Sequence, residues 1–133
     1  MLFRSLKVGG ESRELSSLFT DIANFTTLTE NTSPELLNEL LNVYIDKACE
    51  IVMSHGGLVD KIVGDAVVAI FNAPSIQPDH AERAVNCALA LDAFGEEFRL
   101  AQEEKGIPFG ITRLGVKTDS AGVGYLVVTS RCD

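Results

Sequence analysis

Two aspartates, Asp21 and Asp65, are the residues of this sequence best placed to do chemistry. Each stands at the edge of an apolar, strand-like run, residues 19–22 (FTDI) and 61–66 (KIVGDA). Carboxylates brought together at the ends of neighbouring strands repel, and a shared proton or a bound cation relieves that repulsion. Mg²⁺ favours one or two carboxylates completed by phosphate and water, so the pattern predicts metal-dependent phosphate chemistry. The structural alternative is an ordinary Gly-Asp turn and an aspartate that caps the turn after its strand.

One long helix is predicted between the two aspartates. Ser33 as a hydroxyl cap, Pro34 at the first helical position and Glu35 in the first turn mark its start. His55 followed by two glycines marks its end. Apolar residues at three- and four-residue spacing predict one buried face, formed by Leu36, Leu37, Leu40, Leu41, Tyr44, Ile45, Ala48 and Val52.

Strands are predicted on both sides of this helix. Residues 14–21 alternate as a strand that ends on the first aspartate, and residues 58–63 and 66–71 form a hairpin. Residues 111–117 predict a fourth strand, 119–124 a glycine-containing turn and 125–128 a short fifth strand. Residues 1–12 are expected to be a lead-in or linker because Gly9-Gly10 interrupts any regular pattern, with residues 13–133 as one domain.

A second long helix is predicted to begin at Asp79, with Glu82 completing a capping box, and to end before residues 106–109. Residues 24–31, rich in Thr and Asn, favour turns and short capped helices. The order strand, helix, strand, strand, helix, strand is an α+β, ferredoxin-like βαββαβ plan, with helices on one face of an antiparallel sheet. In that plan the first strand and the hairpin lie side by side, which brings Asp21 and Asp65 close together.

Composition and charge narrow the class of protein. The chain has 133 residues, enough for one domain, and its 46% hydrophobic content is ordinary for a globular protein. A net charge of −8 argues against nucleic acid as a partner but is compatible with a nucleotide whose charge Mg²⁺ carries. The longest apolar run, residues 66–71, is too short to cross a bilayer, and the first ten residues lack a secretory signal. A membrane anchor elsewhere in a longer parent stays open.

The cysteines predict a reducing, cytoplasmic setting. Cys49, Cys87 and Cys132 show no metal-ligand spacing and cannot all pair. Cys49 and Cys87 fall on the apolar sides of predicted helices, where a free thiol behaves as a small hydrophobic group. The two histidines are not expected to bind metal: His55 is predicted to be a helix C-terminal residue and His80 a solvated surface residue.

Several motifs resemble a known family. Residues 18–26 (LFTDIANFT) are similar to the opening motif of the class III nucleotidyl cyclase catalytic domain, and residues 55–66 (HGGLVDKIVGDA) to its second motif. Residues 72–84, with NAP and PDHAERA, match a loop and helix start of many bacterial members, and Arg13-Glu14 also fits. The resemblance covers residues 9–116, and its motifs agree in order, spacing and type.

The resemblance implies a homodimer that cyclises a nucleoside triphosphate and releases pyrophosphate, with sensor domains in a longer parent. It implies two Mg²⁺ or Mn²⁺ ions held by Asp21 and Asp65, with help from the main-chain carbonyl of Ile22. Exposed N–H groups at a helix start also favour anions. The backbone around Asn24, Phe25 and Thr26 is expected near the substrate triphosphate, and Gly64 is also expected to bind substrate. Phe25 is equally suited to packing on the core.

Lys61 is expected to select the base. In the family a lysine at this place, four residues before Asp65, resembles the residue that contacts adenine, whereas guanylyl cyclases usually carry glutamate. Lysine offers only hydrogen-bond donors, which suits the acceptor N1 of adenine, whereas guanine presents a donor there. The resemblance therefore favours ATP and cyclic AMP, with GTP as the alternative substrate. Without the family, Lys61 is an ordinary exposed strand lysine.

The sequence departs from the family toward its end. Residues 117–119 are KTD where the family usually has His-Thr-Gly, and residues 123–125 are VGY where Val-Gly-Asn is common. The chain stops at Asp133, before the segment that in the family carries a second base-reading residue, a ribose-orienting asparagine and a transition-state arginine. Loss of such charge stabilisation typically lowers the rate ~10² to 10³-fold. We therefore expect weak binding of Mg²⁺ and nucleotide and poor turnover, with a non-catalytic dimerisation or nucleotide-sensing module as the alternative.

Overall fold

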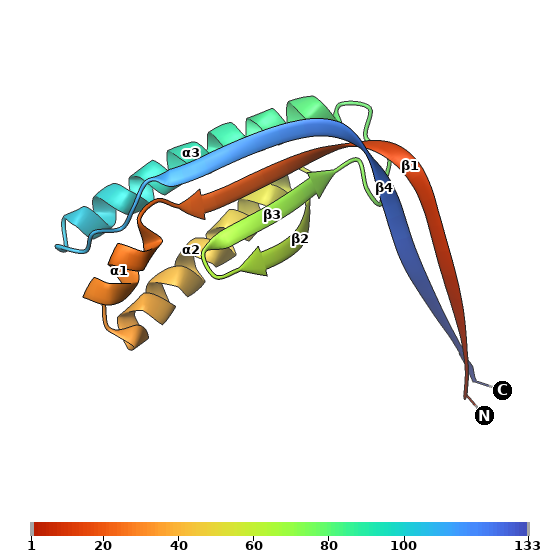
Figure 1. Ribbon diagram of the computed structural model, residues 1–133, viewed down its shortest axis with the longest axis horizontal. Coiled ribbons are helices and arrows are strands. Elements are labelled where there is room, and N and C mark those ends of the chain that lie inside the picture. Colours follow the sequence, from red (N-terminus) through yellow and green to blue (C-terminus); the bar gives the residue numbers. More distant parts are fainter. Residues whose placement is uncertain (1, 133) are drawn as a thin grey trace.

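The computed structural model describes residues 2–132 of the chain, with side chains for residues 12–120. Four strands form one antiparallel sheet in the order β2-β3-β1-β4. The two long helices lie on one face of this sheet, and its other face is open (Figure 1). The predicted α+β, ferredoxin-like arrangement is therefore confirmed. The elements are β1 (Leu2–Ile22), α1 (Phe25–Asn31), α2 (Pro34–Ser54), β2 (Leu58–Val63), β3 (Ala66–Phe71), α3 (His80–Glu103) and β4 (Thr112–Cys132).

Helix α2 begins and ends as its sequence predicts. The Ser33 hydroxyl accepts a hydrogen bond from the main-chain N–H of Leu36, and Pro34 is the first helical residue. His55 is the C-cap residue, and Gly56 follows with a φ of +80°, in the left-handed region that glycine adopts without strain. The hairpin strands β2 and β3 also have the predicted bounds. These features depend on neighbouring residues, and local signals were sufficient to find them.

Strands β1 and β4 are much longer than expected, which corrects the expected break at Gly9-Gly10 and the predicted turn at residues 119–124. Residues 2–12 continue β1, and residues 119–128 continue β4 without a turn or a separate fifth strand. The two strands pair in one unbroken register from Leu2↔Cys132 to Ile22↔Thr112. Each strand supplies the backbone partners of the other, so long-range pairing overrides the local turn preference of the glycines. The division of the chain into residues 1–12 and 13–133 stays a prediction.

The start of α3 also differs from expectation. Asp79 makes no side-chain cap to the helix, because its carboxylate binds the Arg83 guanidinium at 2.8 Å instead. His80 is 6% exposed rather than solvated. Its Nδ1 lies 2.7 Å from the Ser16 hydroxyl and its Nε2 lies 3.0 Å from a carboxylate oxygen of Glu14. The first turn of α3 is therefore attached to β1 by buried polar contacts.

The core between sheet and helices has two parts. One part lies between the middle of the sheet and helices α2 and α3, and it includes Cys87, whose burial raises the pKa of the thiol to about 11. That burial confirms the prediction that Cys87 packs as a small hydrophobic group, whereas the side chain of Cys132 lies outside the described residues. The second part lies under the C-terminal end of β1 and is formed by Ile22, Leu28, Tyr44 and Phe109. Among the described residues, no helix is both long and apolar enough to cross a membrane.

Candidate active site

The end of β1 meets the turn between β2 and β3. The main-chain N–H of Ile22 donates a hydrogen bond of 2.8 Å to Oδ2 of Asp65. The backbone pairing of β1 with β3 extends to Thr20↔Val67, so the Asp65 side chain continues the contact between the strands where the backbone ladder stops. Ile22 directly follows Asp21 in the chain. The structure thus brings together the two segments that the sequence singled out.

The β2–β3 turn needs its glycine for a conformational reason. Val63 pairs with Ala66, which leaves Gly64 and Asp65 as a two-residue turn. Gly64 has a φ of +60°, in the region that residues with a side chain rarely adopt. An added Cβ at Gly64 would meet no atom within 4 Å, so the backbone geometry and not the space selects glycine. The turn points the Asp65 carboxylate at β1, and contact of Gly64 with a substrate stays a prediction.

Asp21 has a partner that the sequence analysis missed. Both of its carboxylate oxygens accept hydrogen bonds from the Arg113 guanidinium, each at 2.8 Å. The two residues are direct cross-strand partners in β1 and β4. The hydrogen bond and the negative charge of Asp21 raise the pKa of Arg113. The available signal was an arginine near the start of the predicted strand 111–117, but the register of that strand against Asp21 could not be counted from the sequence.

The Asp21–Arg113 pair is open to solvent, which decides how strongly it holds. The Asp21 side chain is 41% exposed and that of Arg113 is 63% exposed. A solvent-exposed ion pair contributes little, so a cation of higher charge can compete for the carboxylate. Arg113 therefore partly neutralises the charge of Asp21 but leaves its carboxylate accessible to solvent.

The oxygen atoms available here suit a hard cation that keeps some of its water or phosphate ligands. Asp21 and Asp65 supply carboxylates, and Ile22 can add its carbonyl, because the N–H and C=O of a strand residue point to the same side. Within residues 12–120 no cluster of three or more His, Cys, Asp or Glu is placed to bind a metal. Two carboxylates and one carbonyl leave several positions to phosphate oxygens and water, as Mg²⁺ prefers.

The residues after Ile22 form the start of α1. Asn24 precedes the helix with a φ of +56°, and its side chain does not cap the helix. Phe25 is half-buried and packs against the second part of the core, which agrees with its packing interpretation, and Thr26 is exposed. The first hydrogen bond of the helix runs from the N–H of Leu28 to the carbonyl of Asn24. The expected role of these residues at a triphosphate stays a prediction.

Lys61 lies on the open face of the sheet. It is exposed and pairs with Val68, which in turn pairs with Phe19, so the three residues form one cross-strand row. Asp21 is two residues beyond Phe19 on β1 and therefore points to the same face. Within one chain, Lys61 and Asp21 share a face but are separated by β3. The structure places Lys61 two strands away from the candidate metal ligands.

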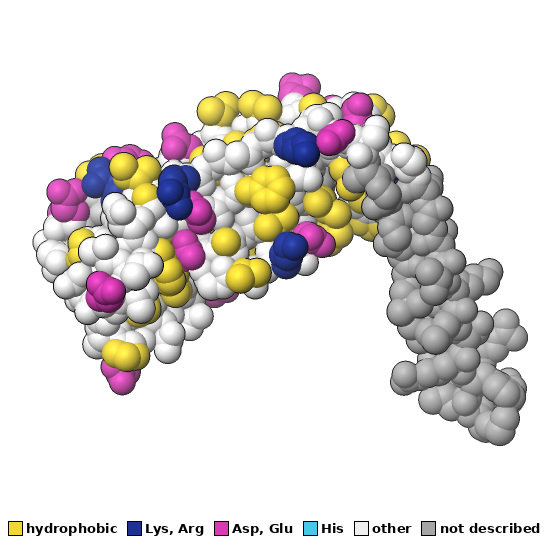
Figure 2. All heavy atoms as spheres, in the orientation of Figure 1, with side chains coloured by type: hydrophobic (Ala, Val, Ile, Leu, Met, Phe, Trp, Pro, Cys, Tyr) yellow, Lys and Arg dark blue, Asp and Glu magenta, His cyan; other side chains and the backbone are white. Residues whose placement is uncertain are grey.

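A shallow hollow of about 400 Å³ occupies this open face beside Asp21. Figure 2 looks onto this face and shows hydrophobic side chains gathered over the sheet, with acidic and basic side chains next to them. The hollow has an apolar floor and a charged pair at one end. It is lined by Phe19, Thr20, Asp21, Ala66, Val67, Val68, Arg113, Leu114 and Gly115.

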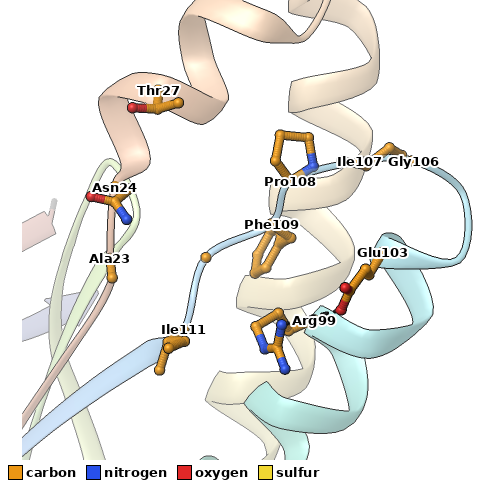
Figure 3. A pocket seen from close by; sticks show the side chains of 11 residues that line it. Ala23, Asn24, Thr27, Arg99, Glu103, Gly106, Ile107, Pro108, Phe109 and Ile111 are labelled. Atoms are coloured by element: carbon orange, nitrogen blue, oxygen red, sulfur yellow. Dashed lines mark hydrogen bonds and ion pairs between the residues drawn. The ribbon is translucent and has the colours of Figure 1, made fainter.

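A larger cavity of about 710 Å³ lies beyond the end of the sheet, between α1, the end of α3 and the segment before β4. Figure 3 shows Asn24 and Thr27 on the side of α1, Arg99 and Glu103 on the side of α3, and Phe109 between them. Neither candidate carboxylate lines it. We therefore take the smaller hollow as the candidate site, because Asp21 lines it.

Comparisons with known proteins identify the family. The family profile described as "Adenylate and Guanylate cyclase catalytic domain" matches residues 10–129. The chain belongs to this cyclase family. The resemblance stated from the motifs is thus confirmed over nearly the whole sequence.

Relatives of both substrate types occur among the similar cyclases. Adenylate cyclase 1 of Rhizobium meliloti (strain 1021) is 42% identical over 119 residues, which is 90% of this chain and 18% of the relative. The crystal structure of the adenylyl cyclase CyaB from P. aeruginosa has a TM-score of 0.83 at 30% identity, over 93% of this chain and 68% of that one. The guanylyl cyclase Cya2 has a TM-score of 0.78, also at 30% identity, over 86% and 58% of the two chains. This cyclase chain therefore spans under a fifth of the length of its curated Rhizobium relative.

Proposed function

We propose that this chain is the catalytic domain of an adenylate cyclase that converts ATP to cyclic AMP and pyrophosphate. The observation that carries the proposal is the hydrogen bond from the Ile22 N–H to Asp65, which joins the two carboxylate-bearing segments at the end of the central strands. Membership in the cyclase family supports the reaction type. The choice of ATP rests on Lys61 and on the donor pattern of its ammonium group.

The proposed metal ligands are Asp21, Asp65 and the carbonyl of Ile22. When bound there, two Mg²⁺ or Mn²⁺ ions would supply activation of the attacking ribose oxygen and stabilisation of the leaving pyrophosphate. Asp65 is already oriented toward β1 by its hydrogen bond with Ile22. Asp21 is held by Arg113, whose guanidinium would compete with a bound cation for the carboxylate oxygens.

We propose that two copies of the domain associate through the open faces of their sheets. Phe19, Leu58 and Val63 expose apolar surface, with 47%, 44% and 65% of each residue accessible. Register places all three on the face that carries Asp21. Within one chain Lys61 lies two strands from Asp21, so a facing copy offers a second way to bring a lysine to a nucleotide bound at the carboxylates.

One observation favours a second candidate function, a non-catalytic module that binds nucleotide or dimerises. The bidentate Arg113 contact compensates the charge of Asp21 without any metal. A guanylate cyclase is the remaining alternative within the family. The retention of both aspartates supports the enzyme, because a scaffold has no need for paired carboxylates.

A paired assay tests these proposals. Cyclic AMP and cyclic GMP formation should be measured with Mn²⁺ and with Mg²⁺, in parallel with ATP and GTP, for the chain and for Asp65→Ala. We expect metal-dependent product from ATP above that from GTP, lost in Asp65→Ala. Equal background product from both proteins would refute the enzyme, and higher product from GTP would refute the base assignment. The same assay tests the expectation that this chain turns ATP over poorly by itself.

A further inference from the structure

Directly beneath the candidate metal ligands, on the helix side of the sheet, lies a group of buried hydroxyls. The Tyr44 hydroxyl on α2 is 2.6 Å from the Thr112 hydroxyl on β4. Thr20 on β1 is 4% exposed, and its hydroxyl has no well-formed hydrogen bond among the described residues. Thr20 lies beside the Tyr44 phenol. Burial raises the pKa of that phenol, and Thr20 acts in the opposite direction. The Tyr44 hydroxyl is therefore hydrogen-bonded to Thr112 on β4 and faces Thr20 on β1.

These contacts fall at the residues attached to the candidate ligands. Thr20 precedes Asp21, and Thr112 is the cross-strand partner of Ile22 and precedes Arg113. Side chains alternate across a strand. A group that contacts Thr20 and Thr112 on the helix side therefore influences the positions of Asp21 and Arg113 on the open side. Burial is the main cause that raises the pKa of Tyr44, and the negative charges of Asp65 and Asp21 raise it further.

The phenol and its partner are fixed by packing. Tyr44 is 2% exposed. Its ring lies 5.4 Å, 5.4 Å and 5.2 Å, centroid to centroid, from the rings of Phe94, Phe98 and Phe109. On the other side, a Cβ added to Gly95 would come within 2.2 Å of the Thr112 hydroxyl, so α3 presses directly on this threonine. Neither hydroxyl has room to move.

From this arrangement we propose that the Tyr44 hydroxyl is a positioning group for the metal site. By holding Thr112 and facing Thr20, it fixes the ends of β4 and β1, and hence the position of Asp21 and Ile22 relative to Asp65. The inference rests on the metal site of the proposed function. The competing explanation is that Tyr44 is a core residue whose hydroxyl affects stability alone.

The test compares Tyr44→Phe with Ser16→Ala. Tyr44→Phe removes only the hydroxyl and keeps the aromatic packing. The Ser16 hydroxyl is also fully buried and hydrogen-bonded on β1, but its partners His80 and Thr118 lie away from the metal ligands. Mn²⁺ affinity without nucleotide is measured from the electron paramagnetic resonance signal of free Mn²⁺, and thermal unfolding is measured for the same samples.

We expect Tyr44→Phe to weaken Mn²⁺ binding by about three- to tenfold. Outer-shell partners of metal ligands typically change metal affinity by about 10- to 100-fold, and Tyr44 acts one contact further out. Ser16→Ala should lower the unfolding temperature and leave Mn²⁺ affinity unchanged. Thr112→Val, which removes the partner hydroxyl, should repeat the effect of Tyr44→Phe and keeps the test decisive if that variant does not fold.

Other outcomes distinguish failure of the Tyr44 positioning role from failure of the proposed metal site. Mn²⁺ binding that Asp65→Ala abolishes but that Tyr44→Phe and Thr112→Val leave intact would overturn the positioning role alone. An equal loss of affinity in Ser16→Ala would also overturn it, because the effect would then follow general destabilisation. Mn²⁺ binding that is absent, or insensitive to Asp65→Ala, would refute the metal site and the role of Tyr44 with it.

Discussion

Asp21 has two possible partners for its carboxylate, a divalent cation and the Arg113 guanidinium. On one side, the Asp65 carboxylate, held by the Ile22 N–H, lies at the end of β1, and its oxygens would suit a divalent cation. On the other side, Arg113 occupies both Asp21 oxygens in a planar, bidentate contact. The guanidinium and a metal ion cannot both use the same lone pairs. At the scale of single residues, Arg113 is therefore a competitor for the proposed ions.

This competition predicts that Arg113→Gln tightens Mn²⁺ binding without nucleotide, by about two- to fivefold. The expected change is small because a solvent-exposed ion pair contributes little. Titration with Mn²⁺ measures the change. Arg99→Gln is the matched control, because Arg99 also forms ion pairs, with Glu96 and Glu103, on α3. Weaker binding in Arg113→Gln would show instead that Arg113 holds Asp21 in its binding position.

The segment between α3 and β4 fixes the turn that follows the candidate ligands. The Ala23 N–H donates a hydrogen bond of 2.8 Å to the carbonyl of Ile111. A Cβ added to Gly110 would lie 1.9 Å from the carbonyl oxygen of Ala23, so the two backbones pass each other with no space for a side chain. Because the close atom is backbone, relief requires a shift of the chain just after Ile22. At the scale of elements, the position of β1 thus depends on the segment before β4.

Gly110→Ala should therefore destabilise the domain by about 1–3 kcal/mol or more, the range seen when extra atoms enter a close-packed site. Urea unfolding measures this free energy. Gly115→Ala on β4 is the control, since a Cβ there meets no atom within 4 Å and should leave stability nearly unchanged. Equal stability of the two variants would contradict the close approach of Gly110 to Ala23.

The whole molecule has one covered and one open sheet face (Figure 1). The helices bury the core side, whereas apolar side chains such as Phe19 remain accessible on the other. Exposed apolar patches of this kind are typical of interaction sites. A net charge of −8 on each copy opposes association, and salt screens that repulsion. Association through the open faces should therefore be stronger at higher ionic strength.

Phe19→Ser should shift the chain toward monomer, because Phe19 is 47% exposed and lies in the central row of the open face. Sedimentation velocity over a range of concentrations and salt measures the distribution. Leu89→Ser removes a comparable apolar side chain, 64% exposed, from α3 on the opposite side of the sheet and should have little effect. Dissociation by Leu89→Ser but not by Phe19→Ser would place the contact on the helices.

Features that depend on near neighbours could be predicted from residue order alone. The Ser33 cap, the Pro34 start and the Gly64 turn involve interactions within a few residues, and residue type alone identifies them. The alternation of strands and helices was sufficient for the fold class, and the fold class was sufficient to expect Asp21 near Asp65. The family followed from motifs that lie within these same local segments.

Features that depend on strand register and on close approach between distant segments became visible in the folded chain alone. The pairing of Asp21 with Arg113 joins residues 92 positions apart, and the burial of His80 depends on Ser16, 64 positions away. The same applies to the unbroken β1–β4 ladder, in which pairing between strands outweighed local turn preference. A shift of one residue in that ladder would move Arg113 to the other face, and no local pattern in the sequence sets that register.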